Sequence, residues 1–180
     1  MRKSALQPLV YNDSRILILG TMPGEKSIQL QQYYGNRGNR FWKIMFEVFD
    51  ETFSTDYDVR KELLKKKKIA LWNVLESCER EGSQDQKIKN EKANDFPAFF
   101  ETFPNIKFVF FESKTAAKFY MRHTLYKVGV QYSTLPSTSG LNAGSSHEEK
   151  VAEWKQVAAA SNNVTLETNT VTGELSGFLT

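Results

Sequence analysis

The chain contains four short apolar segments, and the stretches between them carry apolar residues at helical spacing. Each apolar segment is bounded by turn-forming or charged residues and is too short for a typical helix. Strands that alternate with helices favour a parallel sheet with helices on both faces, because parallel neighbours need crossover connections. The predicted strands are residues 15–20, 68–74, 107–112 and 129–135.

Four amphipathic stretches are predicted to be helices that cover this sheet. Three of them, residues 39–49, 95–103 and 114–123, repeat apolar side chains every three or four positions. The fourth begins at a capping-box pattern, Ser146 with Glu149, and turns Val151, Trp154 and Val157 or Ala158 inward. We therefore expect one α/β domain, a three-layer sandwich, over residues 1–160. Residues 161–180 are expected to form a polar C-terminal tail or an appended hairpin with strands at 164–167 and 171–175.

Composition limits the classes of site that this chain can carry. One cysteine and two histidines in 180 residues leave too few ligands for an iron–sulfur or zinc centre, so no metal or cofactor is expected. The net charge of +3 is compatible with a polyanionic partner but does not single one out. The N-terminus has no signal-peptide pattern and no apolar run is long enough to span a membrane. We expect a monomer in the cytoplasm, associated with the nucleoid.

Polar residues collect where the predicted strands end. The first strand leads into the turn Gly20-Thr21-Met22-Pro23-Gly24, the second ends at Asn73, the third at Glu112, and the fourth opens the loop 136–144. Ligands of parallel sheets bind beyond these carboxyl ends, so one cleft is expected there. Asn73 needs a partner for its amide at a buried strand end. Glu112 is expected to be a surface residue, with a role as general base as the alternative.

Several of these features also have a purely structural interpretation. The Gly-Pro-Gly turn can be only a turn, and Asn39 can be only the cap of the helix that follows it. Tyr33 and Tyr34 can be packing residues at the rim of the cleft. The hydroxyls of the loop after the fourth strand suit phosphate binding, and they equally suit capping of the next helix.

Four segments, in this order along the chain, resemble motifs of the uracil-DNA glycosylase superfamily. They are GTMPG, QYYGNRGNRFWKI, ALWNVLESCEREGS and LPSTSGLNA. The set is most similar to the hypoxanthine-DNA (deoxyinosine) glycosylase branch and shares the NRFWK segment with the mismatch-specific G:T/U branch. The similarity runs from about Leu17 to Trp154, and it implies a four-stranded parallel sheet of order 2-1-3-4.

The resemblance implies a monofunctional DNA glycosylase of base-excision repair that hydrolyses the N-glycosidic bond of a flipped deaminated base. The base would be hypoxanthine, or uracil in a G:U mismatch, and the partner would be double-stranded DNA that contains the damaged or mismatched base. Asn39 would hold the attacking water. The implied base-binding residues are Gly20, Thr21, Met22, Pro23, Gly24, Tyr33, Tyr34 and Asn73, and the implied DNA-binding residues are Pro136, Ser137, Thr138, Ser139, Leu141 and Asn142.

The chain departs from these families in three respects, the third of which involves two positions. Met22 stands where the mismatch-specific branch has a water-positioning Asn, and Leu135 stands where classical uracil enzymes have a His. The hypoxanthine branch tends to show Asp at the position of Asn73 and Asn-Gly at the position of Glu112-Ser113. A non-catalytic nucleic-acid-binding module on the same fold is therefore the alternative.

Overall fold

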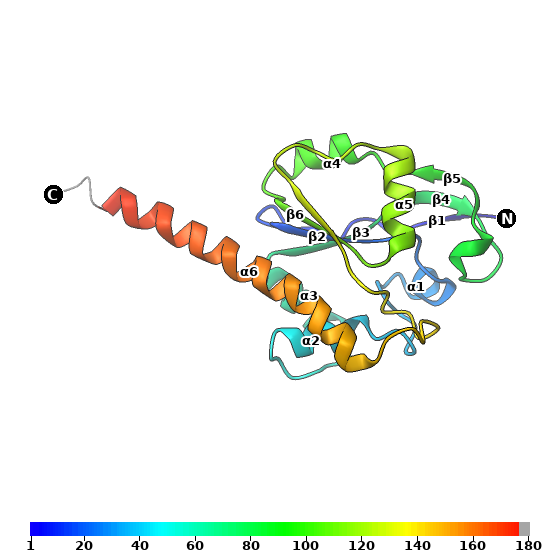
Figure 1. Cartoon of the computed structure of the whole chain (residues 1–180). Helices are drawn as coiled ribbons and strands as arrows, with labels where there is room; N and C mark the ends of the chain where they lie inside the picture. Colours follow the sequence, from blue (N-terminus) through cyan, green and yellow to red (C-terminus); the bar gives the residue numbers. More distant parts are fainter. Residues whose placement is uncertain (177–180) are drawn as a thin grey trace.

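The centre of the molecule is a four-stranded parallel sheet, seen edge-on in Figure 1. The computed structural model describes the backbone of residues 1–176 and the side chains of residues 1–163. The strands are β2 (Ile16–Gly20), β3 (Ile69–Asn73), β6 (Phe108–Phe111) and β7 (Gln131–Thr134), in the spatial order β3-β2-β6-β7. Counted along the chain, this order is 2-1-3-4, so both the four predicted strands and their order are confirmed.

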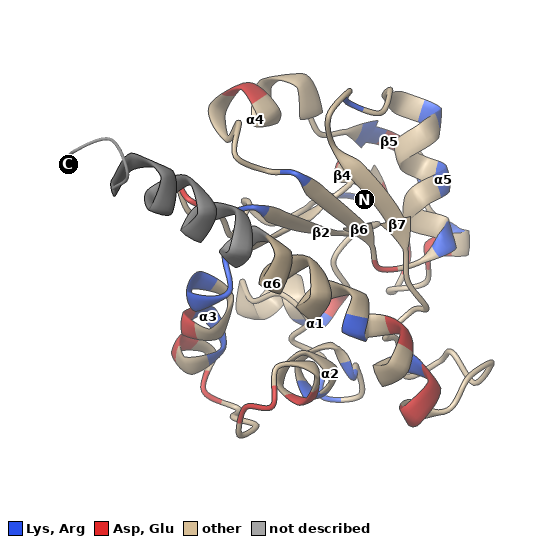
Figure 2. Cartoon of the chain, turned by 60° about the vertical axis from the view of Figure 1, so that its left-hand side comes forward, with Lys and Arg blue, Asp and Glu red and all other residues tan. Residues whose placement is uncertain are grey.

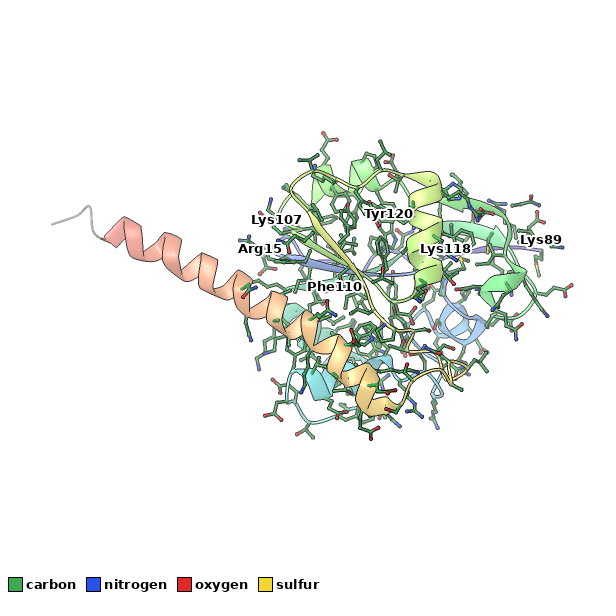
Figure 3. The ribbon with its side chains drawn as sticks, in the orientation of Figure 1. Arg15, Lys89, Lys107, Phe110, Lys118 and Tyr120 are labelled. Carbon is green, nitrogen blue, oxygen red and sulfur yellow. The ribbon has the colours of Figure 1, made fainter. Side chains whose placement is uncertain are left out.

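Helices cover both faces of this sheet. One face carries α2 (Phe41–Val48), α3 (Tyr57–Lys66) and α6 (His147–Ser176), and the other carries α4 (Phe96–Thr102) and α5 (Lys114–His123). Alternate residues of β2 enter the two cores: Ile16 and Ile18 pack against the first group, and Leu17 and Leu19 against the second. Phe110 on β6 and Tyr120 on α5, labelled in Figure 3, belong to the first and second core respectively.

Side-chain caps begin most of these helices. Asp56, Asp95 and Ser113 accept backbone hydrogen bonds at the starts of α3, α4 and α5. The predicted capping box of α6 is present, because Glu149 N donates to Ser146 Oγ and Ser146 N donates to Glu149 Oε2. Such reciprocal bonds satisfy donors that the helix itself leaves unpaired. The inward face predicted for this helix is also present, with Val151, Trp154 and Val157 buried.

A second, antiparallel sheet was not expected from the sequence. It has the order β1-β4-β5, formed by β1 (Arg2–Ser4), β4 (Leu75–Glu79) and β5 (Lys89–Ala93). Only Val74 separates β3 from β4, so one continuous segment contributes a strand to each sheet. Two short elements complete the fold near this sheet, α1 (Glu25–Leu30) and the 3-10 helix η1 (Asp85–Lys87).

The C-terminal segment, for which a polar tail or an appended hairpin was expected, is helical as far as Ser176. The final helix α6 runs without a break from His147 to Ser176, so the segments 164–167 and 171–175 are helical, and residues 177–180 lie outside the described residues. The β-branched Val and Thr residues of this region suggested strands. Once a packed first turn has formed a helix, however, each further residue adds one backbone hydrogen bond at low cost.

Basic side chains are spread over several elements. Figure 2 shows Lys and Arg on α3, α5 and β5, with acidic residues interleaved on α3. No helix among the described residues is both long and apolar enough to cross a membrane.

Candidate active site

The predicted site residues begin to converge at Gly20, the last residue of β2. A Cβ atom added to Gly20 would lie 3.2 Å from Asn73 Nδ2, 3.5 Å from Tyr34 Oη and 3.8 Å from Glu112 Oε2. These three side chains come from the end of β3, from the loop before α2 and from the end of β6. We call this group of four residues the Gly20 cluster. It stands at the carboxyl edge of the parallel sheet, where the sequence predicted a cleft.

Asn73 has a buried side-chain oxygen without a hydrogen-bond partner among the described residues. The side chain is 5 % exposed, and its Oδ1 has no hydrogen-bond partner in the described structure. Its backbone carbonyl is satisfied, because it accepts from Asn94 Nδ2 at 2.8 Å. A buried amide oxygen without a partner costs free energy unless a ligand or water supplies a donor. Asn73 therefore has an acceptor that a ligand or water could use.

The position of Glu112 corrects the expectation of a surface residue. Its carboxylate is partly buried, and Oε1 accepts from Thr138 N at 3.1 Å and from Thr138 Oγ1 at 2.8 Å. Burial raises the pKa of this carboxyl to about 7, Asp85 adds to the rise, and hydrogen bonds from Thr138 and Ser137 oppose it. A carboxyl with such a pKa exchanges protons near neutrality, which is a property of acid–base groups in active sites.

The two adjacent tyrosines have different environments. Tyr34 has a positive φ of 54°, and its ring stacks on Phe41 with centroids 3.8 Å apart. Burial raises the pKa of Tyr34 well above its usual value, and the nearby Glu112 contributes, so the hydroxyl is a neutral hydrogen-bond donor. Tyr33 instead packs in the core and donates its hydroxyl hydrogen to the Gln7 carbonyl at 2.7 Å. Of the pair, only Tyr34 belongs to the Gly20 cluster.

The turn 20–24 is fixed through its carbonyl groups. Gly20 O accepts from Val74 N at 2.8 Å, Thr21 O accepts from Leu75 N at 3.1 Å, and Gly24 O accepts from Ile28 N at 3.1 Å. The carbonyl of Pro23 accepts from the buried guanidinium of Arg80. In a trans peptide the N–H points opposite to the carbonyl, so these bonds also fix the direction of the N–H groups in the turn.

Two further residues of this turn, Met22 and Thr21, are buried. Met22 is 7 % exposed and lies in the second core with Leu17 and Leu19. Thr21 is also buried, next to Asp85, whose carboxyl has a pKa raised by burial. Met22 therefore contributes apolar packing to the second core, and of this turn only Gly20 belongs to the Gly20 cluster.

Asn39 lies at the start of α2, partly buried. Its Oδ1 accepts from Phe41 N at 2.8 Å, so the amide caps the helix as one interpretation of the sequence proposed. An amide oxygen has two lone pairs, and a cap uses only one of them. The next residue ties this loop to the cluster, because Arg40 N donates to the Thr138 carbonyl at 3.0 Å.

The loop that follows β7 packs closely against the loop that contains Asn39. A Cβ atom added to Gly140 would lie 2.6 Å from Gly38 O, so only glycine permits this approach. Within the loop, Ser139 N donates to Ser137 Oγ and Leu141 N donates to Ser139 Oγ. Both hydroxyls act as acceptors in these bonds. The Ser137 hydroxyl also hydrogen-bonds to Glu112, whereas the hydroxyl hydrogen of Ser139 stays available for an outside acceptor such as phosphate.

The predicted DNA-binding residues of this loop differ in exposure. Leu141 is 81 % exposed, as a wedge would be. Thr138 is fully buried, and its hydroxyl donates to Glu112. Its side chain therefore fixes the position of that carboxylate and does not face outward. Pro136 accepts from Trp154 Nε1 at 2.9 Å, and Asn142 donates through Nδ2 to the Ser137 carbonyl at 3.3 Å.

Lys150 is a residue of this region that sequence reasoning missed. It is 2 % exposed, and its Nζ donates to the Asn142 carbonyl at 3.0 Å. Burial lowers the pKa of this ammonium, the nearby Arg40 lowers it further, and Glu112 opposes the change. The sequence does indicate that Lys150 is buried. It precedes Trp154 by four residues on α6, and that spacing puts both side chains on the inner face of the helix.

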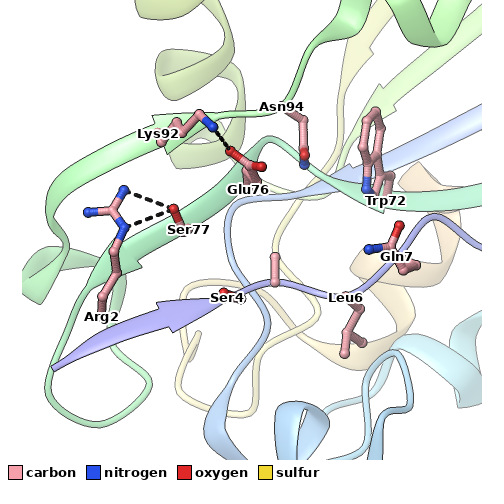
Figure 4. A pocket seen from close by; sticks show the side chains of 10 residues that line it. Arg2, Ser4, Leu6, Gln7, Trp72, Glu76, Ser77, Lys92 and Asn94 are labelled. Atoms are coloured by element: carbon pink, nitrogen blue, oxygen red, sulfur yellow. Dashed lines mark hydrogen bonds and ion pairs between the residues drawn. The ribbon is translucent and has the colours of Figure 1, made fainter.

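A separate cavity of about 420 Å³ lies away from these residues, beside β1 (Figure 4). Four of its polar side chains form two pairs: Lys92 with Glu76, and Arg2 with Ser77. Asn94 lines the cavity and connects it to the site through its bond to the Asn73 backbone. Among the side chains that the structure describes, no cluster of His, Cys, Asp or Glu could hold a metal ion.

Comparison with known proteins gives consistent matches over most of the chain. A family model described as the uracil DNA glycosylase superfamily matches residues 8–160. A protein named hypoxanthine DNA glycosylase from Methanosarcina barkeri is 38 % identical over 151 residues, which cover 83 % of this chain and 94 % of the relative. One of the same name from Methanosarcina acetivorans is 35 % identical over 158 residues, 87 % of this chain and 98 % of the relative.

A solved structure of a similar protein has the same fold as this chain. The solution NMR structure of a candidate uracil DNA glycosylase from Methanosarcina acetivorans superposes with a TM-score of 0.74 at 34 % sequence identity. The superposition covers 88 % of this chain and 99 % of that chain. The α/β sandwich predicted from the sequence is therefore confirmed.

Proposed function

The chain belongs to the uracil DNA glycosylase superfamily, and on that premise we propose that it is a monofunctional DNA glycosylase of base-excision repair. Its reaction is the hydrolysis of the N-glycosidic bond of a flipped deaminated base in double-stranded DNA. Hypoxanthine is the expected base, since the two relatives carry that name. We further propose that the protein acts as a monomer in the cytoplasm, associated with the nucleoid.

One observation carries the choice of substrate: the buried amide of Asn73 has an unpaired Oδ1, and its Nδ2 lies beside Gly20, 3.2 Å from the place of an added Cβ atom. A deaminated base presents an N–H next to a carbonyl, in hypoxanthine as in uracil. An amide offers one acceptor and one donor group, so Asn73 can pair with both atoms of that edge. Tyr34 adds a neutral hydroxyl donor at the same point.

The target nucleotide has to leave the helical stack before the base can reach this cluster. Flipping costs a few kcal/mol and is cheapest at a mispair, which contributes to selectivity. Ser139 is suited to grip a flanking phosphate with its hydroxyl hydrogen, and Ser137, whose hydroxyl hydrogen-bonds to Glu112, would hold this loop in position. Leu141, exposed at the tip of the same loop, would fill the gap that the flipped nucleotide leaves.

Asn39 would position the water that attacks C1′ of the sugar. An amide is not a base, so it can orient water through its second lone pair but cannot take a proton from it. The barrier must therefore fall through stabilisation of the leaving base and of the cationic sugar. The N–H groups of the turn 20–24 would contribute to the stabilisation of the base.

Labelled duplexes that contain inosine, uracil opposite guanine or thymine opposite guanine test this proposal. Incubation with the protein followed by alkali should cleave the inosine strand at the damaged position. Asn39→Ala should lower the single-turnover rate by about 100-fold, because water positioning is lost, while duplex binding remains. Absence of scission on every duplex, with retained binding, would leave a non-catalytic nucleic-acid-binding module as the function.

A further inference from the structure

The carboxyl of Glu112 lies between the loop after β7 and the Gly20 cluster. Its two oxygens have different surroundings: Oε1 accepts both hydrogen bonds from Thr138, whereas Oε2 points to the Gly20 cluster. There it shares one small space with the Asn73 amide and the Tyr34 hydroxyl. A proton on this carboxyl is therefore favoured on Oε2, because Oε1 is already committed as an acceptor.

The charged and titratable groups around Glu112 come from four elements. Asp85 on η1 raises the pKa of the Glu112 carboxyl, and Lys150 on α6 interacts with it attractively. Tyr34, in the loop before α2, stays neutral because burial and Glu112 raise its pKa. Thr138 and Ser137, in the loop after β7, lower the pKa of Glu112 through hydrogen bonds. Burial outweighs the opposing contacts and brings the pKa to about 7, so the acid form is well populated at neutral pH.

We propose that Glu112 is a catalytic residue that contacts the leaving base, donating first a hydrogen bond and then its proton from Oε2. This inference rests on the proposed function and adds to it the group that neutralises the base. Asn39 cannot supply such a proton, and the chain has Leu135 where classical uracil enzymes have a histidine. Leaving-group assistance must come from elsewhere, and Glu112 is the acid that the structure places in the Gly20 cluster.

The proton and electron balance of this step is complete without any further reagent. When the bond between C1′ and the base nitrogen breaks, its electron pair passes to the base. The proton on Oε2 moves to a ring nitrogen or carbonyl oxygen of the base, which leaves neutral, and Glu112 becomes a carboxylate. The water oxygen forms the new bond to C1′ and releases one proton, which returns to Glu112 or to solvent.

The pH dependence of single-turnover excision tests this role, measured on an inosine duplex from about pH 5.5 to about pH 8.5. The wild-type rate should fall by about tenfold per pH unit above about pH 7, as the acid form is lost. Glu112→Gln keeps a donor but has no proton to transfer. Its rate should be about 100-fold lower at acidic pH and nearly constant across the range. Glu76→Gln, in an exposed ion pair with Lys92, is the matched control and should follow the wild-type profile.

A leaving-group series separates proton donation from a structural role. 5-Fluorouracil opposite guanine leaves more easily as an anion than uracil, so the loss caused by Glu112→Gln should be smaller with it. Thr138→Val removes one hydrogen bond that lowers the pKa of Glu112, so the fall in rate should move to higher pH. A Glu112→Gln profile identical to that of the wild type would overturn the inference. So would a wild-type rate that rises with pH, because a carboxylate would then be the active form.

Failure of the proposed function is distinguishable in the same experiment. If the wild-type protein excises none of the bases while a known glycosylase cleaves the same duplexes, the proposed function is overturned. NMR titration with free hypoxanthine then tests whether Glu112 contacts the base. Binding that weakens as the pH rises in the wild-type protein, but not in Glu112→Gln, supports contact between Glu112 and the base. Equal pH dependence in both proteins overturns it.

Discussion

Replacing Gly20 with alanine tests the Gly20 cluster most directly. The added methyl would point into the space shared by three polar groups: 3.2 Å from Asn73 Nδ2, 3.5 Å from Tyr34 Oη and 3.8 Å from Glu112 Oε2. The shortest of these distances is tighter than an ordinary contact, so the Asn73 amide must move by a few tenths of an ångström. A base that enters this space would meet the methyl as well.

The two expected effects of Gly20→Ala differ in size. Gly20 does not have a positive φ, so alanine meets no backbone strain, and the cost to stability is that of mild overpacking, about 1 kcal/mol. For a chain of this size that lowers the melting temperature by about 2–4 °C. Displacement of the base by about 1 Å from its reactive position lowers the excision rate by about 100-fold.

Gly129→Ala is a matched control for this loss of stability. Gly129 has a φ of 84° and no atom within 4 Å of an added Cβ, so alanine costs about 1–2 kcal/mol of strain without crowding. Thermal melting and single-turnover excision on an inosine duplex would be measured for both variants. The melting temperature of both variants should be a few degrees below that of the wild-type protein, and only Gly20→Ala should lose excision activity. A Gly20→Ala protein with the wild-type rate would refute the placement of the base.

Three further substitutions probe the surroundings of the Gly20 cluster. Asn73→Asp puts a second carboxyl beside Glu112 and should extend excision to higher pH, because like charges raise the pKa of the pair; an unchanged pH profile would contradict this. Leu141→Ala should lower inosine-duplex affinity by about tenfold without a change in melting temperature, since the side chain is 81 % exposed; equal affinity by fluorescence anisotropy would contradict the wedge. Lys150→Met removes the bond to the Asn142 carbonyl and should weaken duplex binding while the melting temperature changes little, because a buried apolar side chain of similar shape replaces the charge. A large drop in melting temperature would instead show that Lys150 supports the fold.

The parallel sheet could be predicted because its strands are buried on both faces. Residues Ile16, Leu17, Ile18 and Leu19 are all fully buried, so the sequence shows a continuous apolar run with clear ends. The spatial order of the strands came from the family resemblance, since periodicity carries no information on which strands pair.

The antiparallel sheet could not be predicted by the same rule. Its edge strand β5 reads KNEKA and is mostly exposed, so it has no apolar pattern to recognise. The middle strand β4 follows β3 after a single residue and looks like a continuation of it. Both strands are defined by pairing between distant segments, which a single sequence does not display.

In the site, the residues that could be predicted are those whose type is unusual for their position. An amide at a buried strand end, Asn73, needs a partner, and that need is visible in the sequence. The environment of Glu112 was not visible, because Thr138, which holds it, is distant along the chain. A carboxylate after a strand is most often solvated, so the sequence favoured the surface and was wrong.

The chain departs from the hypoxanthine branch at Asn73 and at Glu112, and the structure brings these two side chains together. That branch tends to have a carboxylate where this chain has Asn73 and an amide where it has Glu112. The structure places both side chains within 4 Å of one point, on the strands that flank β2 on either side. The pair therefore still supplies one amide and one carboxyl to the same small space, from exchanged positions. Because a base edge is read by the donors and acceptors that reach it, this exchange preserves the chemistry needed for a deaminated base. On this account the carboxyl also has a reason to be retained, since it is the proton donor at the point where the base leaves.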